Sequence, residues 1–222
     1  MLGLINTIVI LAFLFFILGK AADKIIFNIR IIAEKLGIPV LFLGIILGLL
    51  TSLPETAIGI NAIINNVSGI AVGNLLGGVV VILCLILGIN LVLNKKVSTS
   101  GEFIYLLPIF AFLFTPLFFG LDGTLGYFDG IAIIFVYIGV LFYLYKKDVH
   151  FTLGRITGAR GGKMAKELFY VIVSLVIIIV ASNVIVKEAS FLLEQMNMSP
   201  FFMGLIIFSI GTNLPESRSV IG

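Results

Sequence analysis

Two copies of one five-residue motif lie inside apolar stretches of the chain, and their residue types could bind a cation. The copies are Thr51-Ser52-Leu53-Pro54-Glu55 and Thr212-Asn213-Leu214-Pro215-Glu216. Each copy places a carboxylate, a hydroxyl group and a proline where a membrane-spanning helix is normally apolar. A charged residue at the centre of a bilayer costs at least roughly 2.5–3.5 kcal/mol, so such residues usually mark ion or substrate paths. The duplicated motif therefore predicts a cation site inside a membrane.

The spacing within each copy gathers oxygen atoms. The threonine, the serine and the glutamate of the first copy lie three and four residues apart, which places them on one helix face. Pro54 has no N–H group, so the carbonyl of Leu50 loses its helical donor. Pro215 frees the carbonyl of Gly211 in the same way. Unwound carbonyls at membrane depth can coordinate Na⁺ or H⁺, and an all-oxygen site suits hard ions such as Ca²⁺.

A simpler interpretation is that each motif is a proline kink whose glutamate pairs with a base. Arg218, two residues after Glu216, could act in this way. A kink alone does not require the threonine and the glutamate to be repeated. The repetition therefore favours the cation site.

Asn74 is a further candidate ligand, in a glycine-rich apolar stretch. Gly69, Gly73 and Gly77 recur at four-residue steps and predict a smooth helix face for close packing. Packing explains the glycines fully but explains the amide of Asn74 less well. We therefore include Asn74 among the candidate site residues.

The composition indicates that these residues belong to a membrane protein. Of 222 residues, 60% are hydrophobic and 11% are charged, whereas soluble domains carry about 25% charged residues. The formal charge of +3 comes from basic residues in loops that a membrane protein holds in the cytoplasm, so it does not indicate nucleic-acid binding. Cys84 is the only cysteine, which excludes an intramolecular disulfide and a multi-cysteine metal site.

Hydropathy predicts an all-α, polytopic membrane protein. Apolar runs of roughly 20 residues can cross a bilayer as helices. The first span is apolar only to about Gly19, and its charged second half is expected to leave the membrane as an amphipathic helix. The seven predicted spans are 4–38, 39–64, 68–93, 103–119, 128–145, 167–186 and 200–222.

Loop charges predict the orientation of these spans. Lysine and arginine concentrate on the cytoplasmic side. The third and fifth spans are followed by basic loops, whereas the loops after the second and fourth spans are neutral or acidic. The N-terminus is therefore expected outside, and the two motifs then cross the membrane in opposite directions. Duplication of a five-helix unit gives such inverted repeats, a common plan among secondary transporters.

The repeat can be followed along the sequence. The offset that pairs Thr51 with Thr212 also pairs Pro39 with Pro200. We expect three regions: a first repeat at 1–147, a basic cytoplasmic linker at 148–163 and the start of a second, inverted repeat at 164–222.

With these features the chain resembles the sodium/calcium exchanger family of cation/calcium antiporters. That family has two inverted five-helix repeats, with a Gly-Thr-Ser-x-Pro-Glu-like motif in each second helix and a Gly-Asn-x-x-Gly-Ser-Asn-like segment in the third. The resemblance implies that Glu55 and Glu216 are the central acidic ligands. It implies flanking oxygen ligands at Thr51, Ser52, Thr212 and Asn213.

The chain departs from the family pattern at several positions. Its third-helix segment matches as far as Gly77 but continues with Gly78-Val79, and Ile82 stands at the next polar position. Three further departures lie in the motif helices: Leu50 replaces a glycine, Asn213 replaces a serine and Arg218 adds a positive charge. A complete second repeat would need three more helices, roughly 84 residues, so the resemblance implies seven helices of ten and an incomplete chain.

The resemblance implies a secondary antiporter that exchanges Na⁺ or H⁺ for Ca²⁺ by alternating access at a shared glutamate site. Its partners would be inorganic cations and the lipid bilayer. No resident cofactor and no enzyme activity are expected, because Ca²⁺, Na⁺ or H⁺ would be cargo. We expect an integral protein of a prokaryotic plasma membrane.

Two alternatives accompany this hypothesis. An intramembrane enzyme would need a nucleophile–base pair or an acid pair, and the only histidine, His150, lies in a loop. A truncated or degenerate paralogue that keeps the fold without transporting is favoured by the lost third-helix oxygens and by Arg218.

Overall fold

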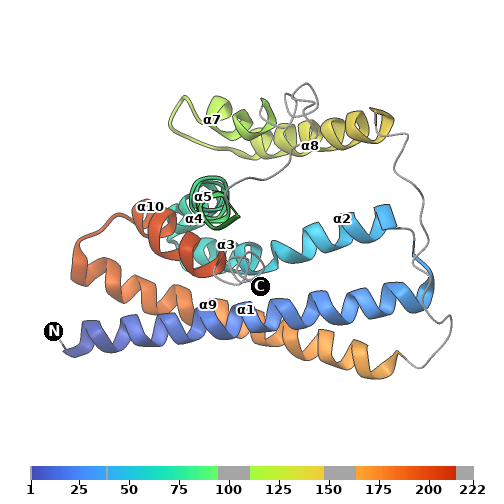
Figure 1. Cartoon of the computed structure of the whole chain (residues 1–222). Helices are drawn as coiled ribbons and strands as arrows, with labels where there is room; N and C mark the ends of the chain where they lie inside the picture. Colours follow the sequence, from blue (N-terminus) through green and yellow to red (C-terminus); the bar gives the residue numbers. More distant parts are fainter. Residues whose placement is uncertain (1, 39, 95–110, 148–163, 214–222) are drawn as a thin grey trace. The chain divides into compact units, whose positions relative to one another are not determined.

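A computed structural model describes residues 2–38, 40–94, 111–147 and 164–213. Every regular element within these ranges is helical, which confirms the all-α prediction. The chain divides into two compact units, residues 1–96 with 154–222 and residues 97–153. We describe each unit by itself (Figure 1).

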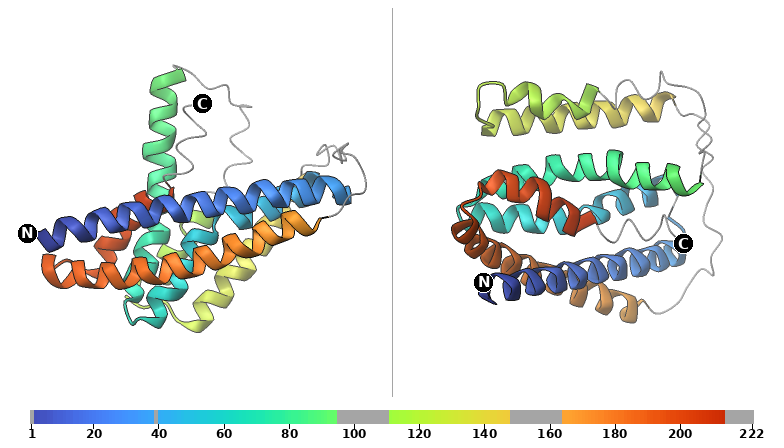
Figure 2. Two further views of the ribbon diagram at one scale, coloured as in Figure 1. Left: turned by 90° about the horizontal axis from the view of Figure 1, so that it is seen from below. Right: turned by 60° about the vertical axis from the view of Figure 1, so that its left-hand side comes forward.

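Two long helices form the base of the first unit. α1 (Leu2–Leu36) and α9 (Ala165–Met196) lie side by side and run antiparallel in all views of Figures 1 and 2. Lys35 Nζ donates to Glu167 Oε1 at 2.9 Å and so joins the end of α1 to the start of α9. Both helices contribute buried apolar side chains to the core: Leu11, Leu18, Ile25, Ile178, Ile185 and Leu192.

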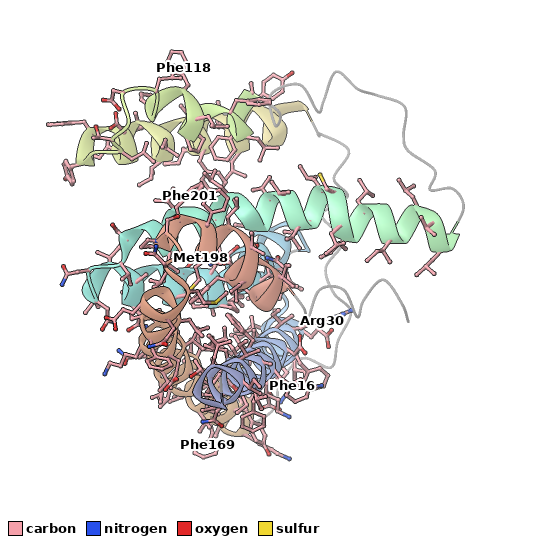
Figure 3. The ribbon with its side chains drawn as sticks, turned by 90° about the vertical axis from the view of Figure 1, so that its left-hand side faces the viewer. Phe16, Arg30, Phe118, Phe169, Met198 and Phe201 are labelled. Atoms are coloured by element: carbon pink, nitrogen blue, oxygen red, sulfur yellow. The ribbon has the colours of Figure 1, made fainter. Side chains whose placement is uncertain are left out.

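The outer side of this helix pair carries exposed apolar side chains. Phe16 on α1 and Phe169 on α9 point away from the pair (Figure 3). Lys20 lies one turn beyond Phe16, and its Nζ is 5.9 Å from the centre of the Phe16 ring. The charged half of α1 therefore follows its apolar half without a break in the helix, as the sequence predicted.

The ends of α1 and α9 are fixed by residues in the left-handed conformation. Gly37 (φ 65°) follows α1, and the N–H of Ile38 returns to the carbonyl of Ala33 at 3.0 Å. Asn197 (φ 48°) ends α9 in the same manner. Both positions suit residues that tolerate positive φ. The predicted span 167–186 was too short, because charged residues after Val186 limit the apolar stretch but do not interrupt the helix.

The first motif interrupts the second predicted span. α2 (Val40–Thr51) and α3 (Leu53–Ile64) are bent by 44° at this break. Pro54 is the second residue of α3, where a helix has no intrahelical partner for an N–H, and the carbonyl of Leu50 at the end of α2 has no N–H donor four residues on. The break that the proline predicts in this span is therefore present.

A third span follows a tight turn in which Asn66 has φ 61°. It consists of α4 (Ser68–Val80), the π-helix η1 (Val81–Ile86) and α5 (Leu87–Asn94), in agreement with the predicted span 68–93. α10 (Pro200–Met203) and the π-helix η2 (Gly204–Phe208) continue as helix to Asn213 and pack on α4.

The glycine face of α4 is in direct backbone contact with this last helix. A Cβ atom on Gly73 would overlap the carbonyl oxygen of Phe201 and lie 2.8 Å from the amide nitrogen of Leu205. A Cβ atom on Gly204 would lie 2.8 Å from the amide nitrogen of Asn74. The predicted close approach along Gly69, Gly73 and Gly77 is therefore confirmed.

The second unit contains α7 (Thr115–Phe119) and α8 (Tyr127–Lys147). The turn between them includes Gly123 with φ 82°, and Asp129 Oδ2 accepts the N–H of Gly126 at 2.7 Å before α8. α8 agrees with the predicted span 128–145. Residues 103–110 of the predicted fourth span lie outside the described residues.

The described helices fit a membrane protein. Among them, three are long and apolar enough to cross a bilayer, and the bent pair of α2 and α3 makes up to four. The helices at 127–143 and 200–213 are apolar but shorter.

Candidate cation site

The first motif lies at the break between α2 and α3, and its hydroxyl groups turn back toward the preceding turn of helix. Thr51 Oγ1 donates to the carbonyl of Gly48 at 2.8 Å, and Ser52 Oγ reaches the same carbonyl at 3.5 Å. Both residues are exposed. Glu55 lies in the first turn of α3, half-buried, with its Oε2 atom buried.

The second motif repeats this local geometry in buried surroundings. Thr212 Oγ1 lies 3.5 Å from the carbonyl of Ser209, and Asn213 Nδ2 donates to the same carbonyl at 2.8 Å. The repeat offset pairs Ser209 with Gly48, so the two copies direct equivalent side chains to equivalent carbonyls. Thr212 and Asn213 are only 5% and 3% exposed.

Asn74 meets the second motif. Thr212 Oγ1 donates to Asn74 Oδ1 at 3.4 Å, and Asn213 Nδ2 donates to Thr212 Oγ1 at 3.3 Å. Asn74 is fully buried, and its Nδ2 atom has no hydrogen-bond partner within the part of the chain that the structure describes. A buried donor of this kind calls for a further partner, because buried polar groups are nearly always hydrogen-bonded.

The structure thus brings together three of the seven predicted site residues. Asn74, Thr212 and Asn213 form one buried cluster, which we call the amide–hydroxyl cluster. No hydrogen bond between described residues joins Thr51 or Ser52 to this cluster. Three other residues of the sequence argument lie outside the described residues: Pro215, Glu216 and Arg218.

Gly78 lies beside the amide–hydroxyl cluster. A Cβ atom on Gly78 would lie 3.3 Å from Asn213 Nδ2, which is tighter than ordinary contact. The small residue at 78 therefore makes room for the longer side chain at 213. Ile82, one turn further on, is 41% exposed. Gly78 on α4 and Asn213 on the facing helix, two departures from the family pattern, thus lie next to each other.

Several residues at this site carry no local sequence signal. Ser209 is fully buried beside Gly77, and its carbonyl accepts from both Thr212 and Asn213. The repeat offset, extended three residues before each motif, could have identified it. Phe15 of α1 packs on Gly211, and nothing in the spacing of α1 predicts this contact.

A second polar network joins the motif helix α3 to α9. Asn61 Nδ2 donates to Ser182 Oγ at 2.8 Å, and Asn183 Nδ2 donates to Asn61 Oδ1 at 3.0 Å. Asn61 and Ser182 are buried among apolar neighbours. This network fixes α3 on the long helix pair, one and two-thirds turns after Glu55.

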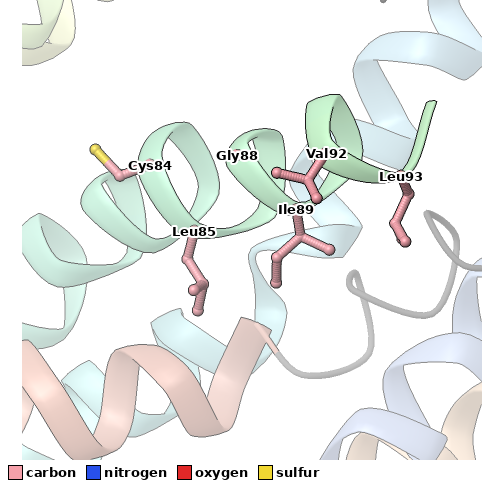
Figure 4. A pocket seen from close by; sticks show the side chains of 6 residues that line it. All are labelled: Cys84, Leu85, Gly88, Ile89, Val92 and Leu93. Atoms are coloured by element: carbon pink, nitrogen blue, oxygen red, sulfur yellow. The ribbon is translucent and has the colours of Figure 1, made fainter. Parts of the chain in front are cut away.

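The described residues also form a shallow apolar depression on η1 and α5, about 360 Å³ in volume (Figure 4). It is lined by Cys84, Leu85, Gly88, Ile89, Val92 and Leu93. Among the described residues, no three His, Cys, Asp or Glu side chains gather in one place. The arrangement near the motifs therefore offers mainly neutral amide, hydroxyl and carbonyl oxygens, with Glu55 as the described carboxylate.

One family model and two known proteins resemble this chain over most of its length. The sequence model of a family described as "Sodium/calcium exchanger protein" matches residues 6–146 and 166–221. Inner membrane protein YrbG of Escherichia coli (strain K12) is 28% identical, over 90% of this chain and 65% of that protein. Sodium/calcium exchanger MaX1 of Methanosarcina acetivorans is 24% identical, over 96% of this chain and 72% of that protein. The chain spans about two thirds of the length of these relatives, and no solved structure matches it.

Proposed function

Because the chain belongs to the sodium/calcium exchanger family, a family of transporters, we propose that it provides cation-binding residues of a secondary antiporter. The exchange is Na⁺ or H⁺ against Ca²⁺, by alternating access at a site shared by Glu55 and Glu216. The two glutamates bind one ion set at a time. Exchange then follows from competition for the same ligands.

The contact between Asn74 and Thr212 is the observation that carries this proposal. It joins the third helix of the first repeat to the motif of the second through a buried hydroxyl–amide pair. Polar groups at membrane depth are expensive and usually functional. The pair lies beside the carbonyl of Gly211, which Pro215 leaves without its helical donor. Together these groups supply the oxygen atoms that a hard cation requires.

The remaining ligands in the proposal are Thr51, Ser52 and Asn213. Ca²⁺ takes about six to eight oxygen ligands, and backbone carbonyls and amide oxygens supply part of that number in many sites. The carbonyls of Gly48 and Ser209 already lie beside the motif side chains. In the same proposal the N-terminus is outside and the two repeats are inverted, which places the motif helices in opposition across the membrane.

The test measures ion flux in vesicles that contain the complete protein. Glu55→Gln keeps the shape of the side chain and removes its charge, so it should abolish Ca²⁺ uptake driven by a Na⁺ or H⁺ gradient. Glu194→Gln on α9 is the matched control, because Glu194 is exposed, lies near the end of α9 and belongs to neither motif. Unchanged uptake in Glu55→Gln would sink the proposal. Varying Ca²⁺, Na⁺ and pH in turn identifies the exchanged ion.

One observation favours the degenerate paralogue as a second candidate. Gly78 and Ile82 contribute no side-chain oxygen at the positions where the family pattern has polar residues. A complete, well-folded protein that moves none of the three ions under any gradient would support this candidate and contradict the antiporter.

A further inference from the structure

We propose that Phe15 controls access to the second motif: its ring covers Gly211 beside Thr212 and shields that half of the site from water. The proposal rests on the proposed function for its meaning in transport. The cover itself is a property of the described residues and can be measured without transport.

Phe15 sits in a notch that only a glycine can provide. A Cβ atom on Gly211 would lie 2.7 Å from three atoms of the Phe15 ring. The ring also meets Phe208 edge to face, with centroids 5.5 Å apart and an interplanar angle of 88°. Phe15 is 4% exposed and Phe208 is fully buried. The ring is therefore held between Gly211 as the floor and Phe208 as a wall.

The helix face under the Phe15 ring also carries Thr212, a candidate ion ligand. Phe208, Gly211 and Thr212 are spaced i, i+3 and i+4, so they share one helix face. A ring seated on the first two lies beside the third. Thr212 is 5% exposed and is bonded to Asn74. The carbonyl of Gly211 is also the one that Pro215 deprives of its helical donor.

At the first motif, no described residue takes the place that Phe15 has at the second. The repeat offset pairs Gly211 with Leu50 and Phe15 with Val176. Val176 is 54% exposed, so it does not pack in a notch as Phe15 does. Thr51 and Ser52 are exposed, in contrast to the buried residues of the second motif. Among the described residues, Phe15 thus has no counterpart at the first motif.

Simple core packing is the competing explanation, and it predicts a different result. A packing residue affects stability when it is truncated, but it does not selectively open one motif to water. The decisive measurement is therefore the reactivity of a reporter on the covered face, with a stability measurement beside it.

The experiment uses Thr212→Cys in a background of the complete protein from which native cysteines have been removed; within these 222 residues the change is Cys84→Ser, because Cys84 is exposed. The probe is a water-soluble, charged methanethiosulfonate. Phe15→Ala should raise the rate of modification at position 212 at least tenfold. Phe13→Ala, on the same helix and 62% exposed, is the matched control and should leave the rate within twofold. Equal rates for Phe15 and Phe15→Ala would overturn the proposal.

Two further variants keep the test decisive if Phe15→Ala folds poorly. Phe15→Leu keeps most of the packing and should give an intermediate rate. Gly211→Ala should displace the ring and raise the rate with Phe15 present, and adding Phe15→Ala should then recover part of the lost thermal stability. Additive losses in the double variant would show that the ring does not depend on the notch, and would overturn the proposal.

The outcomes separate this inference from the proposed function. Flux is measured separately with Thr212 in place, because Thr212→Cys removes a proposed ligand. Raised reactivity in Phe15→Ala, together with no flux in the protein that keeps Thr212, supports the cover and contradicts the antiporter. Normal flux with unchanged reactivity contradicts the cover and leaves the antiporter standing. Raised reactivity together with a lost dependence of uptake on the driving gradient is the result expected when both hold.

Discussion

A methyl group at Gly73 should separate the helices that carry the amide–hydroxyl cluster. The added Cβ atom would overlap the carbonyl oxygen of Phe201, and it would lie 2.8 Å from the amide nitrogen of Leu205 and 3.1 Å from the Cα of Gly204. Carbon atoms normally stay about 3.3–3.6 Å from a carbonyl oxygen. All three neighbours are backbone atoms, so no side-chain rotation can relieve the overlap.

The size of the effect follows from two opposing contributions. Overpacking of a close contact costs about 1–3 kcal/mol, whereas alanine is favoured over glycine in a helix by about 0.8–1.0 kcal/mol. Gly88→Ala supplies the control, because a Cβ atom there has no neighbour within 4 Å. The free energy of unfolding should therefore be lower in Gly73→Ala than in Gly88→Ala by about 1–3 kcal/mol.

The assay is reversible unfolding of the two variants in mixed detergent micelles, each compared with the unsubstituted protein. Separation of the helices also lengthens the hydrogen bond from Thr212 to Asn74, which at 3.4 Å is already near the upper limit for a hydrogen bond. Gly73→Ala should therefore weaken ion binding as well as stability. Equal stability of the two glycine variants would refute the reasoning, since it would mean that the helices are not in backbone contact.

Two other predictions concern bonds that fix the motif helices. Asn61→Ala should lower the free energy of unfolding by about 1 kcal/mol, and a double-mutant cycle with Ser182→Ala should give a coupling near the average of about 0.6 kcal/mol for bonds between membrane helices. Zero coupling would contradict the observed bond. Lys35→Gln and Glu167→Gln should each lower the free energy of unfolding slightly, and less at high salt, because the pair is partly exposed. Strictly additive losses in the double variant would show that the two side chains act independently.

Much of the fold follows from the sequence because apolar length and proline act locally. The break of the second span at Pro54 and the turn at Asn66 are properties of a few adjacent residues. The length of α9 does not follow in the same way. Hydropathy marks where a helix leaves lipid, whereas Asn197 in the left-handed conformation marks where the helix ends.

The candidate site is predictable in part for the same reason. The motif and the repeat offset identify Thr212 and Asn213, and the glycine spacing of α4 predicts a close helix partner for Asn74. Which helix takes that role depends on contacts between residues far apart in the chain. The packing of Phe15 on Gly211 is also a contact between residues far apart in the chain. The sequence does not predict it, because a phenylalanine in an apolar helix can face lipid or another helix equally well.

The pairing of α1 with α9 has a consequence for the host membrane. The apolar stretch of α1 ends before Lys20, whereas that of α9 begins just after Glu167, next to Lys35, so the two stretches are staggered along the pair. With 35 residues α1 is about 52 Å long, against about 30 Å of hydrocarbon. Only the apolar stretch of α1, from Leu2 to Gly19 and about 27 Å long, has to match this thickness. A change of lipid chain length alters the fit of this stretch to the bilayer, and so acts on the helix that carries Phe15.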